Sequence, residues 1–410
     1  MQNHNVSIQK ALPWWANPAK FVMFITLPVF IWSSLYAQEI ADSYNFYNFV
    51  SAEIIFLGMG CLLLIAFGVK LGEAILAKKV PHTQFNETRY ISTIHFLASI
   101  SIIAHIILIG KILVNYHLVF AALSGSIGAI YEVKRNMTKV EGVTTFTQMY
   151  LIVLPLCAAY SHLFAKALPR YTKMIAVSLF VLVFIRAFVT LERLAIVEAV
   201  VAYAIVFISY RTKPVPFVNF FPIFGAVVIY LLFAAGEYTR SWPYYRDVYA
   251  SFWDFVNIRL LGYVGIATNN GAGVLELTGP VNYPYFTAGW FRKLPIWETS
   301  HGPLGYNPLD VVFDRFGSAE FNNPGGILGG VLDFGYLSIL YYLVLGLVSG
   351  LLFALFKKRS VYGLVYFPGW FLGFPVLTQA LFWGDPRFFT VTVFAPFVAM
   401  FIAKKNKRIL

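Results

Sequence analysis

The chain has few charged residues for its length. Of its 410 residues, 12% are Asp, Glu, Lys or Arg, whereas soluble globular domains carry roughly 25%. Too little polar surface remains to keep a water-soluble fold of this size in solution. This scarcity of charge excludes a soluble enzyme, a nucleic-acid-binding protein and a secreted disulfide scaffold.

Cysteine is also scarce, because the chain contains only two, Cys61 and Cys157. Both lie inside apolar runs, which is typical of small buried hydrophobic residues and excludes a disulfide framework. The seven histidines show no metal-ligand spacing. No phosphate-binding loop or dinucleotide motif is present either. We therefore expect no metal and no cofactor.

Hydrophobic residues are abundant, at 59% of the chain, and they recur in long runs. A run of about 17–25 apolar residues is long enough to cross the ~30 Å hydrocarbon core of a bilayer as a helix. The sequence predicts an all-α polytopic membrane protein with about ten transmembrane helices, near 20–36, 54–70, 90–109, 145–165, 173–189, 194–210, 216–235, 327–356, 361–382 and 388–403.

Most lysines and arginines fall in alternate connections between these spans. They gather near 70–89, 166–173, 211–213 and 357–359, and at both ends of the chain. Because basic loops stay in the cytoplasm, both termini are expected there. Counting Ile112–Tyr131 as a span would place the later basic loops on the wrong side. We therefore expect that segment to be either re-entrant or a surface helix.

The longest polar connection, 236–326, lies between spans 7 and 8 and is expected outside the cytoplasm. It is dense in Trp, Tyr and Phe, which disfavours disorder. We expect a folded cap with short helices near 243–268 and 308–316, joined by turns such as Asn269-Asn270-Gly271. The predicted domains are a bundle of seven spans (1–235), the cap loop (236–326) and a bundle of three spans (327–410).

The apolar run that follows Pro324 is too long for one untilted span. Asp333-Phe334-Gly335 is the natural place for a break between an interfacial segment and a crossing helix. Farther along, Gly346 and Gly350 form a small-xxx-small motif, which predicts close packing against another helix.

Arginines gather on the same side as the cap, which opposes the usual distribution of positive charge. The planar guanidinium binds phosphate or pyrophosphate oxygens in pairs and needs no metal to do so. The alternative interpretation is ion pairing with acids or lipid phosphates; for Arg186, this would be a pair with Glu198 that joins two spans. The candidate pyrophosphate contacts are Arg186, Arg193, Arg240, Arg246, Arg259, Arg315 and Arg387.

Other cap-side residues suit a sugar and a proton transfer. Tyr263, Asn269 and Asn270 offer a ring and amides to sugar faces and hydroxyls, although an Asn-Asn-Gly turn is also ordinary turn chemistry. Asp385 shares a short turn with Arg387. Two residues compete as the general base. His301 is the only histidine in the cap, and an imidazole is a common general base toward a hydroxyl group. Glu198 is an ionisable group inside a span.

The number of spans, the late large loop and the arginines together resemble the Wzy-type O-antigen or oligosaccharide repeat-unit polymerases. The stretch from Leu191 to Glu198 contains an Arg-x-x-x-x-Glu pattern that resembles the start of a middle span in this family. The segments Asn323–Gly329, Asp333–Tyr336 and Leu345–Leu347 resemble the stretch where the family's loop runs back into the membrane.

The resemblance implies an enzyme of the bacterial inner membrane. It would polymerise undecaprenyl-pyrophosphate-linked repeat units into O-antigen or a related surface polysaccharide at the periplasmic face. The glycosyl transfer would need no metal and no nucleotide sugar. Arginines would hold the pyrophosphates, and a base near the acceptor hydroxyl would remove its proton. The implied partners are these lipid-linked oligosaccharides, the lipid bilayer and a chain-length regulator protein, with no nucleic acid.

Two other functions remain open. An O-antigen ligase would use the same donor, so the arginines do not distinguish it from a polymerase. A flippase or transporter of lipid-linked sugars belongs to a different class, in which inverted repeats and paired broken helices are common. The chain shows no convincing internal repeat, and its charged residues concentrate on one side. This pattern favours chemistry over transport.

Overall fold

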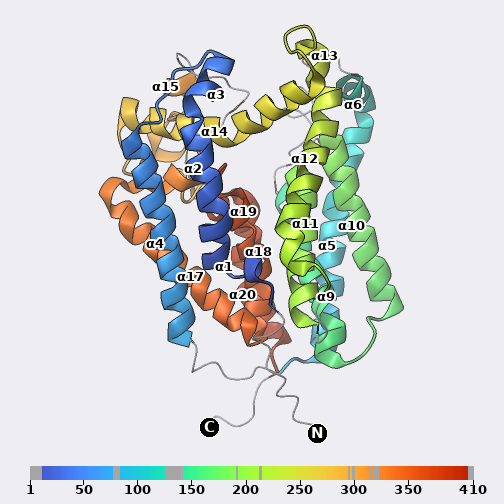
Figure 1. Cartoon of the computed structure of the whole chain (residues 1–410). Coiled ribbons are helices and arrows are strands. Elements are labelled where there is room, and N and C mark those ends of the chain that lie inside the picture. The colour runs from blue at the N-terminus through green and yellow to red at the C-terminus, as the bar shows by residue number, and fades with distance from the viewer. Residues whose placement is uncertain are drawn as a thin grey trace.

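The computed structural model describes residues 12–76, 84–124, 140, 142–190, 193–211, 215–293, 296–297, 301–313, 316, 321 and 323–404. Within these residues every regular element is a helix (Figure 1). The one extended pairing among them is an isolated bridge between Phe85 and Ala403. The chain is therefore an all-α protein over the part that the structure describes.

Ten apolar helical stretches account for the predicted windows. Seven are long and apolar enough to cross a membrane: Pro18–Leu35, Ala52–Leu76, Glu87–Val114, Thr144–Phe164, Arg170–Val189, Val218–Tyr238 and Gly326–Lys357. Three shorter apolar helices, Leu194–Tyr210, Val361–Val376 and Pro386–Ile402, overlap the remaining windows. Each predicted window coincides with one of these stretches because a long apolar run leaves the backbone no polar partner except itself.

The helices of the first half of the chain fall into two groups. The first group comprises η2 (Trp14–Ala16), α1 (Pro18–Phe21), η3 (Val22–Thr26), α2 (Leu27–Leu35), α3 (Ala37–Tyr44) and α4 (Ala52–Leu76). The second comprises α5 (Glu87–Val114), α6 (Tyr116–Leu123), α8 (Thr144–Thr147), α9 (Tyr150–Phe164), α10 (Arg170–Thr190) and α11 (Arg193–Tyr210).

The later elements form the rest of the bundle and one end of the molecule. Helix α12 (Phe221–Arg240), preceded by η4 (Val218–Phe220), runs along the bundle (Figure 1). It is followed by α13 (Trp242–Tyr245), α14 (Phe252–Thr278), η5 (Phe291–Lys293), η6 (Gly302–Leu304) and α15 (Asp310–Phe313). The chain then returns through α16 (Gly326–Phe334), η8 (Gly335–Leu337), α17 (Ser338–Lys357), α18 (Val361–Phe371), α19 (Gly373–Val376), η9 (Phe382–Gly384) and α20 (Pro386–Ile402).

Helix α9 forms the centre of the core. Its residues from Tyr150 to Tyr160 are all buried, and it packs against α5, α10, α11, α18 and α20. A helix that is apolar on every side can be stable only where other helices surround it. This central position brings side chains of α10, α11 and α20 close to Tyr150, the first residue of α9.

Helices α4 and α17 pack with their backbones in contact, as the small-xxx-small motif predicts. A Cβ added at Gly346 or Gly350 would collide with the backbone of α4. A Cβ at Gly68 or Gly72 of α4 would collide with the backbone of α17 in the same way. Glycine on both helices therefore permits the close approach.

The break predicted at Asp333-Phe334-Gly335, within the apolar run that follows Pro324, is confirmed. Helix α16 ends at Phe334, the backbone turns at Gly335 with φ 54°, and α17 begins at Ser338. Glycine adopts this left-handed conformation without steric cost, so it can end one helix just before the next begins.

The prediction of short helices near 243–268 and 308–316 is correct only in part. Short helices are present as α13 and α15, but most of 243–268 belongs to one long helix. A single 27-residue helix, α14, runs from Phe252 to Thr278 and lies across one end of the bundle, which we call the cap end (Figure 1). Asn269-Asn270-Gly271 lies within this helix and does not form a turn. Gly271 provides a close contact, because a Cβ there would collide with the carbonyl oxygen of Pro324.

The segment Ile112–Tyr131 is described only in its first part. Helix α5 continues to Val114, Asn115 interrupts it, and α6 follows as a separate short helix. Tyr116 and Phe120 of α6 are exposed. Residues 125–139 lie outside the described residues, so the re-entrant or surface position of this segment stays a prediction.

Candidate functional site

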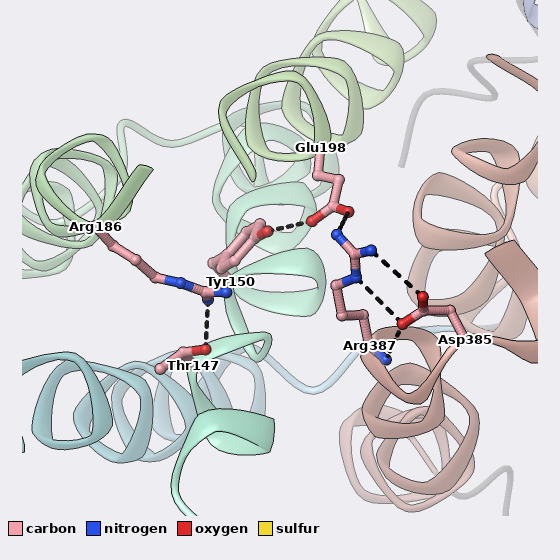
Figure 2. A network of polar contacts seen from close by, with 6 residues as sticks. All are labelled: Thr147, Tyr150, Arg186, Glu198, Asp385 and Arg387. Carbon is pink, nitrogen blue, oxygen red and sulfur yellow. Dashed lines mark hydrogen bonds and ion pairs between the residues drawn. The ribbon is translucent and has the colours of Figure 1, made fainter. Parts of the chain in front are cut away.

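A buried carboxylate on α11 forms the centre of a polar network at the cap end. Glu198 is 1% exposed. The hydroxyl of Tyr150, at the start of α9, donates a hydrogen bond of 2.6 Å to its Oε2. On the other side, the guanidinium of Arg387 lies 3.9 Å from Oε1 (Figure 2). The network therefore joins three helices that are distant from one another in sequence.

Arg387 is held in place by the residue that caps its own helix. Asp385 precedes α20, and its carboxylate accepts the backbone N–H of Arg387 at 2.8 Å. The same carboxylate accepts the Nε and Nη2 groups of Arg387 at 3.2 and 3.3 Å (Figure 2). The Arg387 side chain is 38% exposed, whereas that of Glu198 is 2% exposed. Arg387 is therefore the most exposed member of the network and the cation in it that a ligand can reach.

Arg186 on α10 adds a second cation beside this network. It is 2% exposed, and its Nη1 donates to Thr147 Oγ1 at 2.6 Å (Figure 2). The backbone carbonyl of Thr147 in turn accepts from Ser101 of α5 at 3.0 Å. Arg186 and Glu198 thus contact different partners, Thr147 and Tyr150, which stand on the adjacent α8 and α9.

Arg259, another predicted pyrophosphate contact, is buried among residues outside the Glu198 network. Arg259 of α14 is 1% exposed, and its Nε lies 3.4 Å from Oε2 of Glu237 on α12, which is fully buried. Four aromatic rings surround the guanidinium at 5.0–6.0 Å, from Tyr245, Phe255, Tyr263 and Phe321. Tyr263 thus lies against an arginine inside the protein. This arrangement joins α12 to α14.

The two predicted sugar-binding amides also make contacts within the protein. Asn269 accepts the backbone N–H of Phe49 at 2.7 Å and donates to the carbonyl oxygen of Tyr47 at 2.8 Å. Asn270 donates to the carbonyl oxygens of Phe321 and Asn323. Both side chains bind α14 to neighbouring chain segments, since their partners have no regular backbone pairing of their own.

Of the remaining predicted arginines, only Arg246 has a described side chain. Arg246 is exposed at the cap end, with Nε 3.8 Å from Asp247. The structure includes the backbone of Arg193 and Arg240 at the ends of α11 and α12, but their side chains lie outside the described part. Arg315 lies outside the described residues altogether.

His301 belongs to a second polar cluster, within the cap segment (residues 236–326). The Tyr285 hydroxyl lies 3.0 Å from His301 Nδ1 and donates to Asn307 Oδ1 at 3.2 Å. The guanidinium carbon of Arg292 stands 4.1 Å from the centre of the Tyr285 ring. Burial raises the pKa of Tyr285, and the charge of Arg292 partly opposes this effect. Tyr285 is therefore a neutral hydroxyl with one proton to donate.

The loop that carries Tyr285 packs directly on the turn before Arg387. The backbone N–H of Trp290 donates to the carbonyl oxygen of Gly384 at 3.2 Å. The ring centres of Trp290 and Phe389 are 5.2 Å apart. The polar cluster in the cap segment and the Glu198 network are thus built on adjoining pieces of chain.

Asp333 fixes the position of this loop. It is fully buried on α16, and its carboxylate accepts the backbone N–H groups of Phe286 at 3.0 Å and Thr287 at 2.6 Å. It also accepts the Thr287 hydroxyl at 2.6 Å. A carboxylate with several donors is well satisfied even when it is buried. An acid within an apolar run was the sequence signal for such a role.

Several residues of both clusters could not be identified from sequence. Tyr150, Thr147, Tyr285, Asn307 and Arg292 are ordinary residues of spans or loops, with no distinguishing spacing. Only their three-dimensional neighbours give them a role. Among the residues that the structure describes, no three His, Cys, Asp or Glu side chains form a group that could hold a metal ion.

Comparison with known proteins adds no family to this picture. No protein-family model, no curated protein and no solved structure matches the chain.

Proposed function

We propose that the chain is a polymerase of lipid-linked oligosaccharide repeat units, of the Wzy type that its sequence resembles. Its substrates would be undecaprenyl-pyrophosphate-linked oligosaccharides, and its product would be O-antigen or a related surface polysaccharide. The observation that carries the proposal is the accessible Arg387 guanidinium, which Asp385 orients toward the buried Glu198 at the cap end. An accessible cation on a buried polar network is well suited to a phosphate group at the membrane boundary.

The proposed orientation places the cap end in the periplasm of a bacterial inner membrane, with all ten apolar helices crossing. The distribution of charge supports this assignment. The opposite end of the bundle carries a concentration of basic residues, which suits the cytoplasmic side. In the described part of the chain these residues include Lys166, Arg170, Lys173, Arg211, Lys357, Lys358 and Arg359.

In the proposed reaction, Arg387 binds the pyrophosphate of the donor lipid. A hydroxyl oxygen of the acceptor unit forms a bond to the anomeric carbon, and the bond from that carbon to the pyrophosphate oxygen breaks. Negative charge grows on the leaving pyrophosphate, so a pre-oriented guanidinium stabilises the transition state more than the ground state. Arg186 adds positive charge beside the same network.

His301 is the better candidate for the general base. The Glu198 carboxylate is almost fully buried and already accepts the Tyr150 proton. It can therefore hold Arg387 in place more readily than it can meet an acceptor hydroxyl. His301 is partly exposed in the cap segment, on a loop system that contacts the turn before Asp385. It would take the proton that the acceptor hydroxyl loses.

Gel analysis of surface glycan in a deletion strain tests the assignment. Loss of a polymerase leaves a single repeat unit on the surface lipid, and complementation with the intact gene restores long chains. Loss of a ligase leaves no repeat unit there, and loss of a flippase leaves the unit inside the cell. Either of the last two patterns would contradict the proposal.

Arginine variants sharpen the same experiment. Arg387→Lys keeps the charge but loses the planar fork, so it should shorten the glycan strongly. Arg170→Lys, at the exposed start of α10 and the opposite end of the bundle, is the matched control and should restore wild-type lengths. Both variants need confirmed levels in the membrane.

A further inference from the structure

We propose that Tyr285, Asn307 and Asp310 hold His301 in the tautomer whose Nε2 atom accepts a proton. They would then act as positioning residues for the base of the proposed reaction. This inference rests on the proposed function for its chemistry, but the tautomer follows from hydrogen-bond geometry alone. Each step depends on which atom can donate and which can only accept.

Two hydrogen bonds define the orientation of the Asn307 amide. Asn307 donates through Nδ2 to the carboxylate of Asp310, at 2.8 Å. Its Oδ1 accepts the backbone N–H of Leu309 at 3.3 Å. A carboxylate accepts and a backbone N–H donates, so these two contacts identify the two ends of the amide. The atom that faces Tyr285 is therefore the carbonyl oxygen of Asn307.

The single hydroxyl proton of Tyr285 is donated to Asn307. A carbonyl oxygen has no proton to give, so the 3.2 Å contact between Tyr285 and Asn307 requires the Tyr285 hydroxyl to donate. That proton is then unavailable for His301. The 3.0 Å contact with His301 Nδ1 can form only if Nδ1 carries a proton and the Tyr285 oxygen accepts it.

The protonation of Nδ1 determines the protonation of the other ring nitrogen, Nε2. A neutral imidazole carries one proton, so a protonated Nδ1 leaves Nε2 with its lone pair. Tyr285 is 1% exposed, and its ring lies beneath the Arg292 guanidinium. The burial of Tyr285 keeps water from competing for its hydroxyl proton. The series of hydrogen bonds from Asp310 through Asn307 and Tyr285 to His301 thus leaves Nε2 as the proton acceptor.

Selective ¹⁵N labelling of histidine in the intact protein tests the tautomer directly. NMR distinguishes a ring nitrogen that carries a proton from one that carries a lone pair. The His301 signals are assigned by their absence in His301→Gln. At a pH where the ring is neutral, the expected result is a lone pair on Nε2 and a proton on Nδ1. The opposite pattern in the wild-type protein would overturn the inference.

Two variants and one control test the relay. Tyr285→Phe removes the acceptor of the Nδ1 proton, and Asn307→Ala frees the Tyr285 proton to bind Nδ1. Both should shift the ring proton toward Nε2. Tyr306→Phe, an exposed tyrosine of the same loop, should leave the His301 signals unchanged. A wild-type pattern in both relay variants would show that these residues do not position the ring.

Polymerisation by the same preparations separates the inference from the proposed function. With a positioned base, Tyr285→Phe and Asn307→Ala should slow polymerisation by about 10-fold or more, and Tyr306→Phe should not. If His301→Gln polymerises at the wild-type rate, the base assignment is wrong. The fixed tautomer would then still stand on the NMR result.

Discussion

Two of the arginine–carboxylate pairs at the cap end, Arg259 with Glu237 and Arg387 with Glu198, differ in nearly every physical respect. In the pair between Arg259 and Glu237, both side chains are at most 1% exposed and aromatic rings enclose the cation. In the pair between Arg387 and Glu198, the acid is buried but the arginine is 38% exposed. The closest oxygen and nitrogen atoms are 3.4 Å apart in the first pair and 3.9 Å apart in the second.

This difference separates a structural contact from a site. A fully enclosed pair has no face left for a ligand, and its energetic role is to keep each charge compensated in a region without water. A pair with one accessible partner keeps a cation oriented while leaving its outer face open. From the sequence alone, Arg259 and Arg387 were both predicted to be pyrophosphate contacts. Burial is the property that distinguishes them.

The same substitution in both acids should have opposite consequences, and Glu237→Gln should have the largest effect on stability. It leaves the Arg259 charge buried without its carboxylate, which costs about 3–5 kcal/mol of unfolding free energy. Thermal unfolding in detergent should show a much lower midpoint. The double variant Glu237→Leu with Arg259→Met removes both charges and should recover most of that loss. A midpoint near wild type for Glu237→Gln would contradict the structural role of the pair.

Glu198→Gln should instead affect activity. The Gln side chain can still accept from Tyr150, but it no longer carries the charge that faces Arg387. We expect polymerisation to fall by about 100-fold, with an unfolding midpoint at or above that of the wild type. A normal glycan length distribution together with lowered stability would show that this pair, too, is structural.

Tyr150→Phe should have a smaller effect on the same network. It removes one hydrogen bond to a buried carboxylate and leaves the packing of the ring intact. A hydrogen bond to a charged group is worth about 1.5–3 kcal/mol. At the lower end of that range, we expect the unfolding free energy to fall by about 1.5 kcal/mol and the polymerisation rate by roughly 10-fold. Tyr203→Phe on α11 is the control, and it should behave as the wild type in a rate assay.

Asp385→Asn should have the smallest effect. Asparagine caps a helix about as well as aspartate, so α20 should keep its stability. The guanidinium of Arg387 loses a charged partner but retains Glu198, and we expect polymerisation to slow a few-fold. A loss as large as that of Glu198→Gln would mean that Asp385 itself contacts the substrate.

The helices could be predicted from the sequence and the sites only in part. Apolar runs located the helical stretches because a helix satisfies all its backbone hydrogen bonds within one segment, as an apolar environment requires. Helix α14 was missed because Asn269-Asn270-Gly271 has the composition of a turn, and only the approach of Pro324 explains the glycine.

The sequence identified Glu198 because an acid within an apolar run is conspicuous. The sequence also named Arg387, but it could not predict that Arg387 and Tyr150 contact Glu198, since they come from helices that are distant in sequence. The burial of Arg259 was equally hidden, because nothing in the local sequence specifies which rings will surround a side chain. Packing between distant segments therefore determined which predicted residues form a site.

The most direct test of the central claim is polymerisation by the purified protein, reconstituted with undecaprenyl-pyrophosphate-linked repeat units, for the Arg387→Lys variant. We expect a rate lowered by about 10- to 100-fold, because lysine cannot reproduce the planar guanidinium, and an unchanged unfolding midpoint. Arg170→Lys should polymerise at the wild-type rate. If Arg387→Lys makes full-length glycan at that rate, Arg387 does not hold the pyrophosphate and the proposed site is wrong.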